Sequence, residues 1–243
     1  MRNQMTSKQR QQGFTLVEIA IVLVIIGLLL GGILKGQELI TSARVRNIAD
    51  QNSGVQAAYY GFVDRFRQVP GDWPQANAAQ AIPGVTTGGN GNGRLDLSGT
   101  EWTEPLALWE QLSKAGFIQG NFVGGTAPPT ASDTNLAPRN AFNGFLALYR
   151  STDYADDSGG TKALRLNLTL GRQIPVNVMR ELDLKIDDGL PNSGVLRHAL
   201  TTGQGAKLNS PGESNTTCVD NTPKPKIWNI AGNEEDCNAI YLY

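Results

Sequence analysis

The chain has 243 residues, with 21 Lys and Arg against 22 Asp and Glu, and thus a formal net charge of −1. A balance this even argues against nucleic-acid binding through a strongly basic surface. The single histidine, His198, leaves few Ser–His–Asp or Cys–His arrangements, and the sequence has no phosphate-binding loop or dinucleotide fingerprint. The composition therefore favours a protein that is not an enzyme and needs no cofactor.

A long apolar stretch begins at Phe14 and ends at Leu34. Its 21 residues contain one charged side chain, that of Glu18. As a helix rising about 1.5 Å per residue, it would be roughly 30 Å long, which is the thickness of the hydrocarbon core of a bilayer. We therefore expect a transmembrane helix over residues 14–36, with a carboxylate near its beginning.

Glu18 needs a partner or a task in such a helix. An acidic side chain within a membrane span costs about 2.5 to 3.5 kcal/mol on insertion scales, and the apolar run offers no cation. Cleavage between Gly13 and Phe14 would create an α-amino group four residues before Glu18. That amine could neutralise the carboxylate, either within one helix or between neighbouring helices.

Residues 13–18 read Gly-Phe-Thr-Leu-Val-Glu, with a basic leader before them and the apolar helix after them. This segment resembles the prepilin processing motif of type IV pilins and of the pseudopilins of type II secretion. The resemblance implies cleavage after Gly13 by prepilin peptidase, N-methylation of Phe14 by the same enzyme, and pairing of Glu18 with the Phe14 amine of a neighbouring subunit during assembly. It also implies other pilin subunits, the inner-membrane assembly machinery and membrane lipid as partners.

The leader, residues 1–13, contains Arg2, Lys8 and Arg10 and no acidic residue. By the positive-inside rule it stays in the cytoplasm, and the rest of the chain lies beyond the inner membrane. An ordinary secretory signal would need a small-residue cleavage site soon after the apolar run, and the nearest candidate, residues 41–43, begins well past Leu34. We therefore expect a periplasmic head before assembly, and an extracellular pilus or a periplasmic pseudopilus afterwards.

Residues 37–67 change from uniformly apolar to amphipathic. Apolar side chains recur at helical spacing, and residues 69–72, Val-Pro-Gly-Asp, stop the pattern. The stripe consists of Leu39, Ile40, Ala43, Ile48, Val55, Ala58, Tyr59, Phe62, Val63 and Phe66. The pattern predicts one helix of about 50 residues, whose second half packs on a globular head.

The head, residues 68–243, divides into a connection over 68–140, which the resemblance to pilins implies is variable, and a strand-rich part over 141–243. The connection carries one clear helix, residues 104–115, and a second, short helix is expected over residues 174–182. Strand signals fall over residues 145–149, 164–170, 195–200, 227–230 and 239–243. The leucines of 164–170 alternate with polar residues, which predicts a strand with one buried face. The expected fold class is α+β with a type IV pilin-like fold, in which the long helix packs on an antiparallel sheet.

Two stretches suggest a cation. Residues 88–96 place Asn90, Asn92 and Asp96 at oxygen-donor positions of an EF-hand-like calcium loop, but glycines stand where its first and last carboxylates belong. A glycine and asparagine turn is the alternative. Asp183, Asp187 and Asp188 form the second stretch, for which a solvated turn is the alternative.

Cys218 and Cys237 enclose 18 residues. They could be free thiols or half of a zinc site. A head outside the inner membrane favours a disulfide instead, and His198 provides at most one further familiar zinc ligand. The resemblance agrees, because many pilins have a C-terminal region bounded by a disulfide.

The function expected from these features is that of a structural subunit, a pilin of a type IV pilus or related filament, in adhesion, motility or DNA uptake. The resemblance favours a minor pilin, because the chain is larger than many major pilins. A pseudopilin of a type II secretion system is one alternative. A membrane-anchored periplasmic binding protein or enzyme is another, and in that case Glu18 would be dispensable.

Overall fold

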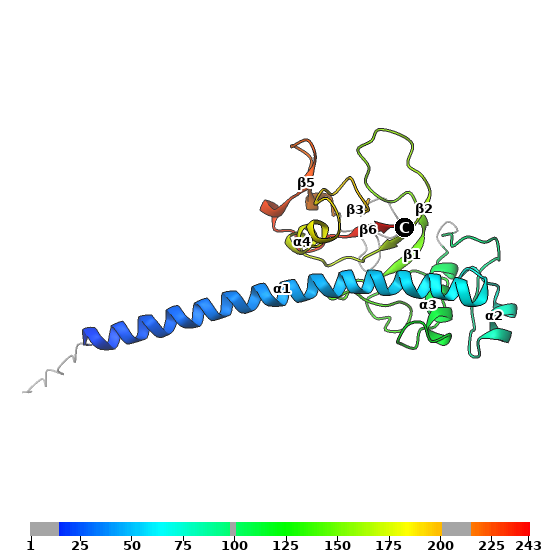
Figure 1. The fold of residues 1–243 in the computed structure, drawn as a ribbon, viewed down its shortest axis with the longest axis horizontal. Helices are drawn as coiled ribbons and strands as arrows, with labels where there is room; N and C mark the ends of the chain where they lie inside the picture. The colour runs from blue at the N-terminus through cyan, green and yellow to red at the C-terminus, as the bar shows by residue number, and fades with distance from the viewer. Residues whose placement is uncertain (1–14, 98–100, 201–214) are drawn as a thin grey trace, which may run out of the picture. The chain divides into compact units, whose positions relative to one another are not determined.

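The computed structural model describes residues 15–97, 101–200 and 215–243 (Figure 1). The chain separates into two compact units, residues 1–43 and residues 44–243. The first unit contains the beginning of helix α1, and the second contains its remainder with all the other helices and strands named below.

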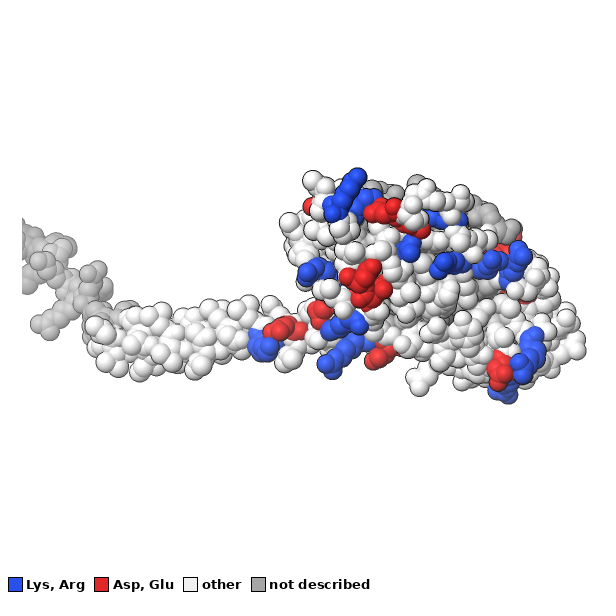
Figure 2. Space-filling model, turned by 45° about the horizontal axis from the view of Figure 1, so that its top comes forward, with Lys and Arg blue, Asp and Glu red and all other residues white. Residues whose placement is uncertain are grey.

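Helix α1, Leu16–Phe66, has 51 residues and confirms the prediction of one long helix. Among the described residues it is the helix that is long and apolar enough to cross a membrane. Its side chains between Leu16 and Leu34 are exposed, including the large ones of Leu23, Leu28 and Leu30. On the face shown in Figure 2 this part of the helix carries no charged surface.

From Val45 onward, one side of α1 is buried. The buried residues are Val45, Ile48, Asn52, Val55, Ala58 and Phe62. Their spacing of three and four residues places them on one face of the helix. The stripe predicted from the sequence began too early, because Leu39 and Ile40 are 63% and 57% exposed.

Two helices follow in the connecting region. Helix α2, Gln75–Ala81, was not predicted, because its Ala and Gln residues show no apolar periodicity and Pro74 supplies no side-chain cap. Helix α3, Thr103–Lys114, confirms the expected helix over residues 104–115. Its Leu and Trp side chains are buried in the core of the second unit.

A four-stranded antiparallel sheet has the strand order β1-β2-β6-β3. Its strands are β1 (Ala147–Ser151), β2 (Arg165–Thr169), β3 (Leu196–His198) and β6 (Ala239–Leu242). A separate two-stranded sheet pairs β4 (Val219–Asp220) with β5 (Ile227–Trp228). Helix α4, Val176–Ile186, lies between β2 and β3 in the chain, and the short 3₁₀ helices are η2 (Asn215–Cys218) and η3 (Ile230–Gly232).

The expected alternation in β2 is wrong. Leu164 lies outside the strand and is 49% exposed, whereas Asn167 and Thr169 are fully buried. Successive side chains of a strand point to opposite faces, and both Asn167 and Leu168 have no exposed surface. The sheet is therefore covered on both faces at this end of β2.

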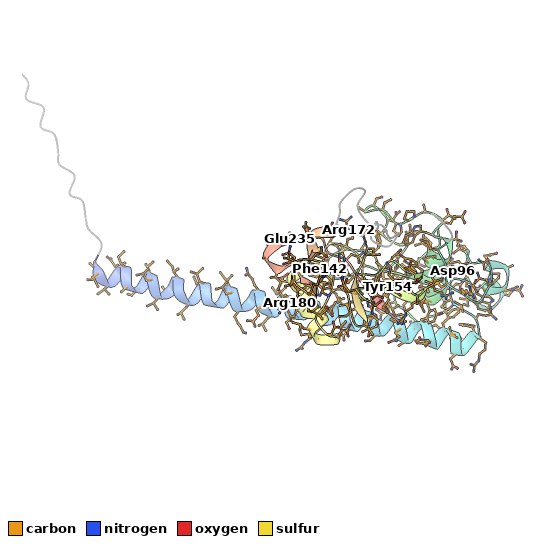
Figure 3. The ribbon with its side chains drawn as sticks, turned by 90° about the horizontal axis from the view of Figure 1, so that it is seen from above. Asp96, Phe142, Tyr154, Arg172, Arg180 and Glu235 are labelled. Atoms are coloured by element: carbon orange, nitrogen blue, oxygen red, sulfur yellow. A yellow bond between two sulfur atoms is a disulfide. The ribbon has the colours of Figure 1, made fainter. Side chains whose placement is uncertain are left out.

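Side chains from α1, α3, α4 and the sheet form one hydrophobic core in the second unit, where the sticks are densely packed (Figure 3). The aromatic rings of Phe62 and Phe66 on α1 contact those of Trp73 and Phe117. A long apolar N-terminal helix and an antiparallel sheet make an α+β architecture, consistent with the expected pilin-like fold.

Candidate functional site at the start of the long helix

Thr15 and Glu18 bind each other at the beginning of α1. Glu18 Oε2 accepts hydrogen bonds from the Thr15 backbone N–H at 2.8 Å and from the Thr15 hydroxyl at 2.9 Å. Thr15 Oγ1 in turn accepts the Glu18 backbone N–H at 3.3 Å. Since α1 begins at Leu16, Thr15 is the N-cap and Glu18 the third helical residue of a capping box.

The sequence analysis missed Thr15, although the local signal is present. A Thr three residues before a Glu, directly ahead of an apolar run, is the usual pattern of a capping box. Glu18 thus has a partner in its own subunit that carries no charge, and it lies where the helix dipole favours an anion. Gly13 and Phe14 lie outside the described residues, so cleavage, methylation and the pairing of Glu18 with an amine stay predictions.

The surface that follows Glu18 is apolar and contains small residues. A Cβ added at Gly27, Gly31 or Gly32 would meet no other described atom within 4 Å. Gly27 and Gly31 are spaced by four, a spacing that lets helices approach each other closely inside a membrane. This part of α1 can therefore pack against other apolar helices or lipid.

Residues 8–34 match the family described as the prokaryotic N-terminal methylation motif. The chain carries a prepilin signal. The motif indicates a prepilin of the type IV pilin or pseudopilin type that a prepilin peptidase processes. Together with the apolar helix it indicates membrane anchoring before assembly. No curated protein and no solved structure matches the chain.

The second unit of the chain contains the expected disulfide. Cys218 and Cys237 are bonded and fully buried. The bond closes a loop that contains β4, β5 and η3. In the chain-entropy picture a loop of this size contributes about 3 kcal/mol to stability.

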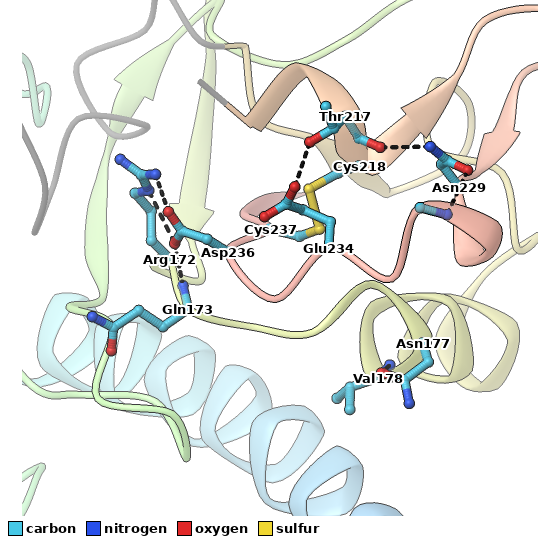
Figure 4. The surroundings of a disulfide bond; sticks show 11 residues. Arg172, Gln173, Asn177, Val178, Thr217, Cys218, Asn229, Glu234, Asp236 and Cys237 are labelled. Carbon is cyan, nitrogen blue, oxygen red and sulfur yellow. Dashed lines mark hydrogen bonds and ion pairs between the residues drawn. A yellow bond between two sulfur atoms is a disulfide. The ribbon is translucent and has the colours of Figure 1, made fainter. Parts of the chain in front are cut away.

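Polar contacts hold the surroundings of the disulfide (Figure 4). The Arg172 guanidinium forms an ion pair with Asp236, whose Oδ1 also accepts the Gln173 backbone N–H at 2.9 Å. The Thr217 hydroxyl donates to Glu234 at 2.6 Å. The contacts of Asp236 tie the segment before Cys237 to the residues that lead into α4. The bond between Thr217 and Glu234 joins that segment to the residue before Cys218.

The glycine-rich loop over residues 88–96 does not have the geometry of an EF-hand. Its backbone N–H groups at Gly91, Asn92 and Gly93 point at the carboxylate of Asp72, at 2.8 to 3.0 Å. The side-chain oxygens of Asn90 and Asn92 accept N–H groups within the loop. The loop thus binds an anionic side chain of its own chain, which the sequence analysis missed.

Two of the three calcium candidates line a common cavity. Asn90 and Asp96 border a cavity of about 230 Å³ together with Glu101 and Glu104, whereas Asn92 does not. Both oxygens of Glu104 accept backbone N–H groups, from Asn90 and Asp96. Burial raises the pKa of Glu104. Calcium at this loop stays a prediction.

His198 is a core residue. It lies in β3 with 7% of its surface exposed, and its ring is 6.1 Å from that of Trp228. Its backbone N–H donates to the Pro191 carbonyl at 2.7 Å. These contacts agree with the structural role expected for it from the sequence.

Proposed function

We propose that the chain is a structural subunit of a type IV pilus, a minor pilin that is cleaved after Gly13 and methylated at Phe14. The prepilin motif over residues 8–34 carries this proposal. The mature subunit would enter the filament through the apolar part of α1, and its partners would be other pilins, the prepilin peptidase and the inner-membrane assembly machinery.

The exposed apolar half of α1 supports assembly through this helix. Burying apolar surface stabilises an association by about 25 cal/mol per Å², and the side chains from Leu16 to Leu34 are exposed in the single chain. Lipid covers this surface before assembly, and like helices would cover it afterwards. The four-residue spacing of Gly27 and Gly31 suits close packing of such helices.

Glu18 would fix the register between subunits. Thr15 binds one oxygen of the carboxylate, Oε2, without neutralising its charge. A charge that becomes buried without a counterion is strongly penalised. The methylated amine of Phe14 in a neighbouring subunit would supply that counterion, so subunits that place the two groups together would be favoured.

The substitution Glu18→Gln removes the negative charge of the side chain but keeps the helix cap, because Gln also serves at the third position of a capping box. We expect the variant to accumulate in the membrane and to be cleaved, but to be lost from filaments sheared off the cell surface. Glu38→Gln is the matched control, since Glu38 is an exposed acidic residue of the same helix that pairs with Lys35. Normal filament incorporation of Glu18→Gln would contradict the proposal and favour a helix that serves only as an anchor.

Localisation distinguishes the pilin from a pseudopilin. A pilin is expected in the sheared surface fraction, and we expect this chain there. A processed chain confined to the cell envelope, together with a secretion defect in its absence, would contradict the pilus assignment and support a type II secretion pseudopilin.

A further inference from the structure

Three aspartates gather where α4 ends and the following turn begins. Asp183, Asp187 and Asp188 each offer one carboxylate oxygen, and these oxygens lie within 4.8 Å of one another. Asp183 is fully buried, Asp187 is partly buried and Asp188 is exposed. None of the ion pairs among the described residues includes any of the three.

One carboxylate oxygen of Asp183 is buried, whereas a solvated turn would expose its carboxylates to water. Its Oδ2 accepts the indole N–H of Trp228 at 2.7 Å, whereas its Oδ1 is buried and has no hydrogen-bond partner. Burial, and then the charges of Asp188 and Asp187, raise the pKa of Asp183 to about 7, although the hydrogen bond from Trp228 lowers it. A buried carboxylate oxygen without a partner is costly.

The other two carboxylates are held in place by the turn. Asp187 Oδ2 accepts the backbone N–H groups of Val195 and Leu196. Asp188 accepts the Leu190 N–H and the Ser193 hydroxyl. Glycine is required at position 194, because a Cβ there would lie 1.9 Å from Asp187 Oδ2. The acidic cluster is therefore arranged before any ion arrives.

We propose that Asp183, Asp187 and Asp188 bind a calcium ion. Calcium takes six to eight oxygen ligands at about 2.3 to 2.6 Å in flexible geometry, so two ligands of one ion lie up to roughly 5 Å apart, which the cluster satisfies. Magnesium demands nearly ideal octahedral coordination. Carboxylates that backbone contacts already hold in place fit this geometry less well than the flexible geometry of calcium.

Asp188, the exposed member of the cluster, lines a cavity from which an ion and its waters can approach. The cavity has a volume of about 420 Å³ and is lined by Asp188, Gly189 and Trp228, among others. Arg180 also lines it, and none of the ion pairs found between described residues joins Arg180 to an aspartate of the cluster. The remaining calcium ligands are water molecules from this side.

The ion would connect three parts of the head. Asp183 belongs to α4, Asp187 and Asp188 begin the turn to β3, and Trp228 belongs to β5 inside the disulfide-closed loop. Calcium would therefore hold this region together outside the cytoplasm. Extracellular calcium modules bind with dissociation constants of about 10⁻⁴ to 10⁻³ M.

Calcium titration of the full chain in detergent micelles tests this site. After treatment with EDTA, we expect calcium to bind in that affinity range by calorimetry and to raise the midpoint of thermal unfolding. Asp183→Asn and Asp188→Asn should each weaken binding at least about tenfold, since each removes a charged ligand. Asp220→Asn is the matched control, because Asp220 lines the same cavity but does not belong to the cluster. The calcium affinity of this variant should stay within about twofold of the wild-type value.

Three results would overturn the proposal. The first is no binding of calcium by the wild type up to about 10 mM, above the range of extracellular sites. The second is an Asp188→Asn variant that folds and binds calcium as tightly as the wild type does. Asp188 is exposed, so its substitution is not expected to disturb the fold. The third is binding that Asp96→Asn abolishes and Asp183→Asn leaves intact, which would assign calcium to the loop over residues 88–96.

Discussion

The hydroxyl of Tyr243 donates a hydrogen bond of 2.9 Å to Asn52 Oδ1 on α1. Tyr243 follows β6, the strand that lies between β2 and β3 in the sheet, so the contact joins the sheet to the buried stripe of the helix. Burial raises the pKa of Tyr243 well above its usual value. The phenol therefore stays protonated and remains a donor over the physiological pH range.

Removing this hydroxyl should destabilise the head. Tyr243→Phe leaves the side chain of Asn52, which is 7% exposed, without its donor, and an orphaned buried polar group costs about 1 to 3 kcal/mol. Urea unfolding followed by tryptophan fluorescence measures the change. Tyr241→Phe is the control, because Tyr241 lies in β6 and the hydrogen bonds to Asn52 come from Tyr243 instead. Equal stability of Tyr243→Phe and the wild type would show that this contact adds nothing.

Reduction of the disulfide should also destabilise the head. The double variant Cys218→Ala with Cys237→Ala is expected to lose about 3 kcal/mol, because the unfolded chain gains the freedom of the open loop. Equilibrium unfolding of wild type and variant, each without reductant, gives the difference. Added dithiothreitol should lower the stability of the wild type and leave that of the variant unchanged. A wild type insensitive to reductant would contradict the role assigned to the bond.

The stability of the head should depend on pH through Asp183. Burial raises the pKa of Asp183 to about 7 in the folded state, from an ordinary value of 3.8. Between pH 3.8 and 7 the folded state therefore binds more protons at this group than the unfolded state does. The stability that Asp183 contributes is then fully present below about pH 4 and is lost as the pH rises to about 7, by up to about 1.4 kcal/mol per pH unit. Chemical unfolding at several pH values with calcium chelated measures this slope.

Asp183→Asn provides the comparison for that slope. The amide keeps an acceptor for Trp228 and has no charge to bury, so its stability should fall less between pH 5 and 8 than that of the wild type. Parallel curves for the two proteins would show that Asp183 titrates normally in the folded state.

The cap at the beginning of α1 can be tested by Thr15→Val. The variant loses the hydroxyl and its two hydrogen bonds with Glu18, and loss of an N-cap costs about 1 kcal/mol. Hydrogen exchange of the full chain in micelles should be faster at the first turn of the helix. Thr41→Val changes the same side chain in the helix interior and should leave that turn unchanged. Unchanged exchange in Thr15→Val would show that the capping box contributes little.

Local patterns predicted the elements that depend on local sequence. Helix α1 follows from an uninterrupted apolar and then amphipathic run, and α3 follows from the spacing of Leu106, Leu108, Trp109 and Leu112. The capping box of Thr15 and Glu18 was equally local and could have been predicted. Helix α2 lacks such a pattern and was missed.

Long-range contacts could not be predicted in the same way. The burial of Asn167 depends on its bonds to Ser151 across the sheet, at 3.1 and 3.2 Å. The cluster of aspartates was seen in the sequence, but its buried member binds Trp228, 45 residues away. The anchoring of the glycine-rich loop by Asp72 likewise spans some 20 residues. Such pairs follow from the folded topology.

Mass spectrometry of the N-terminal peptide, on membrane and sheared surface fractions, tests the central claim most directly. We predict a mature chain that begins with methylated Phe14, present in the sheared fraction. An intact leader, or cleavage near Ala43, would contradict the predicted processing and the assembly through Glu18. Either result would favour a membrane-anchored or secreted protein instead.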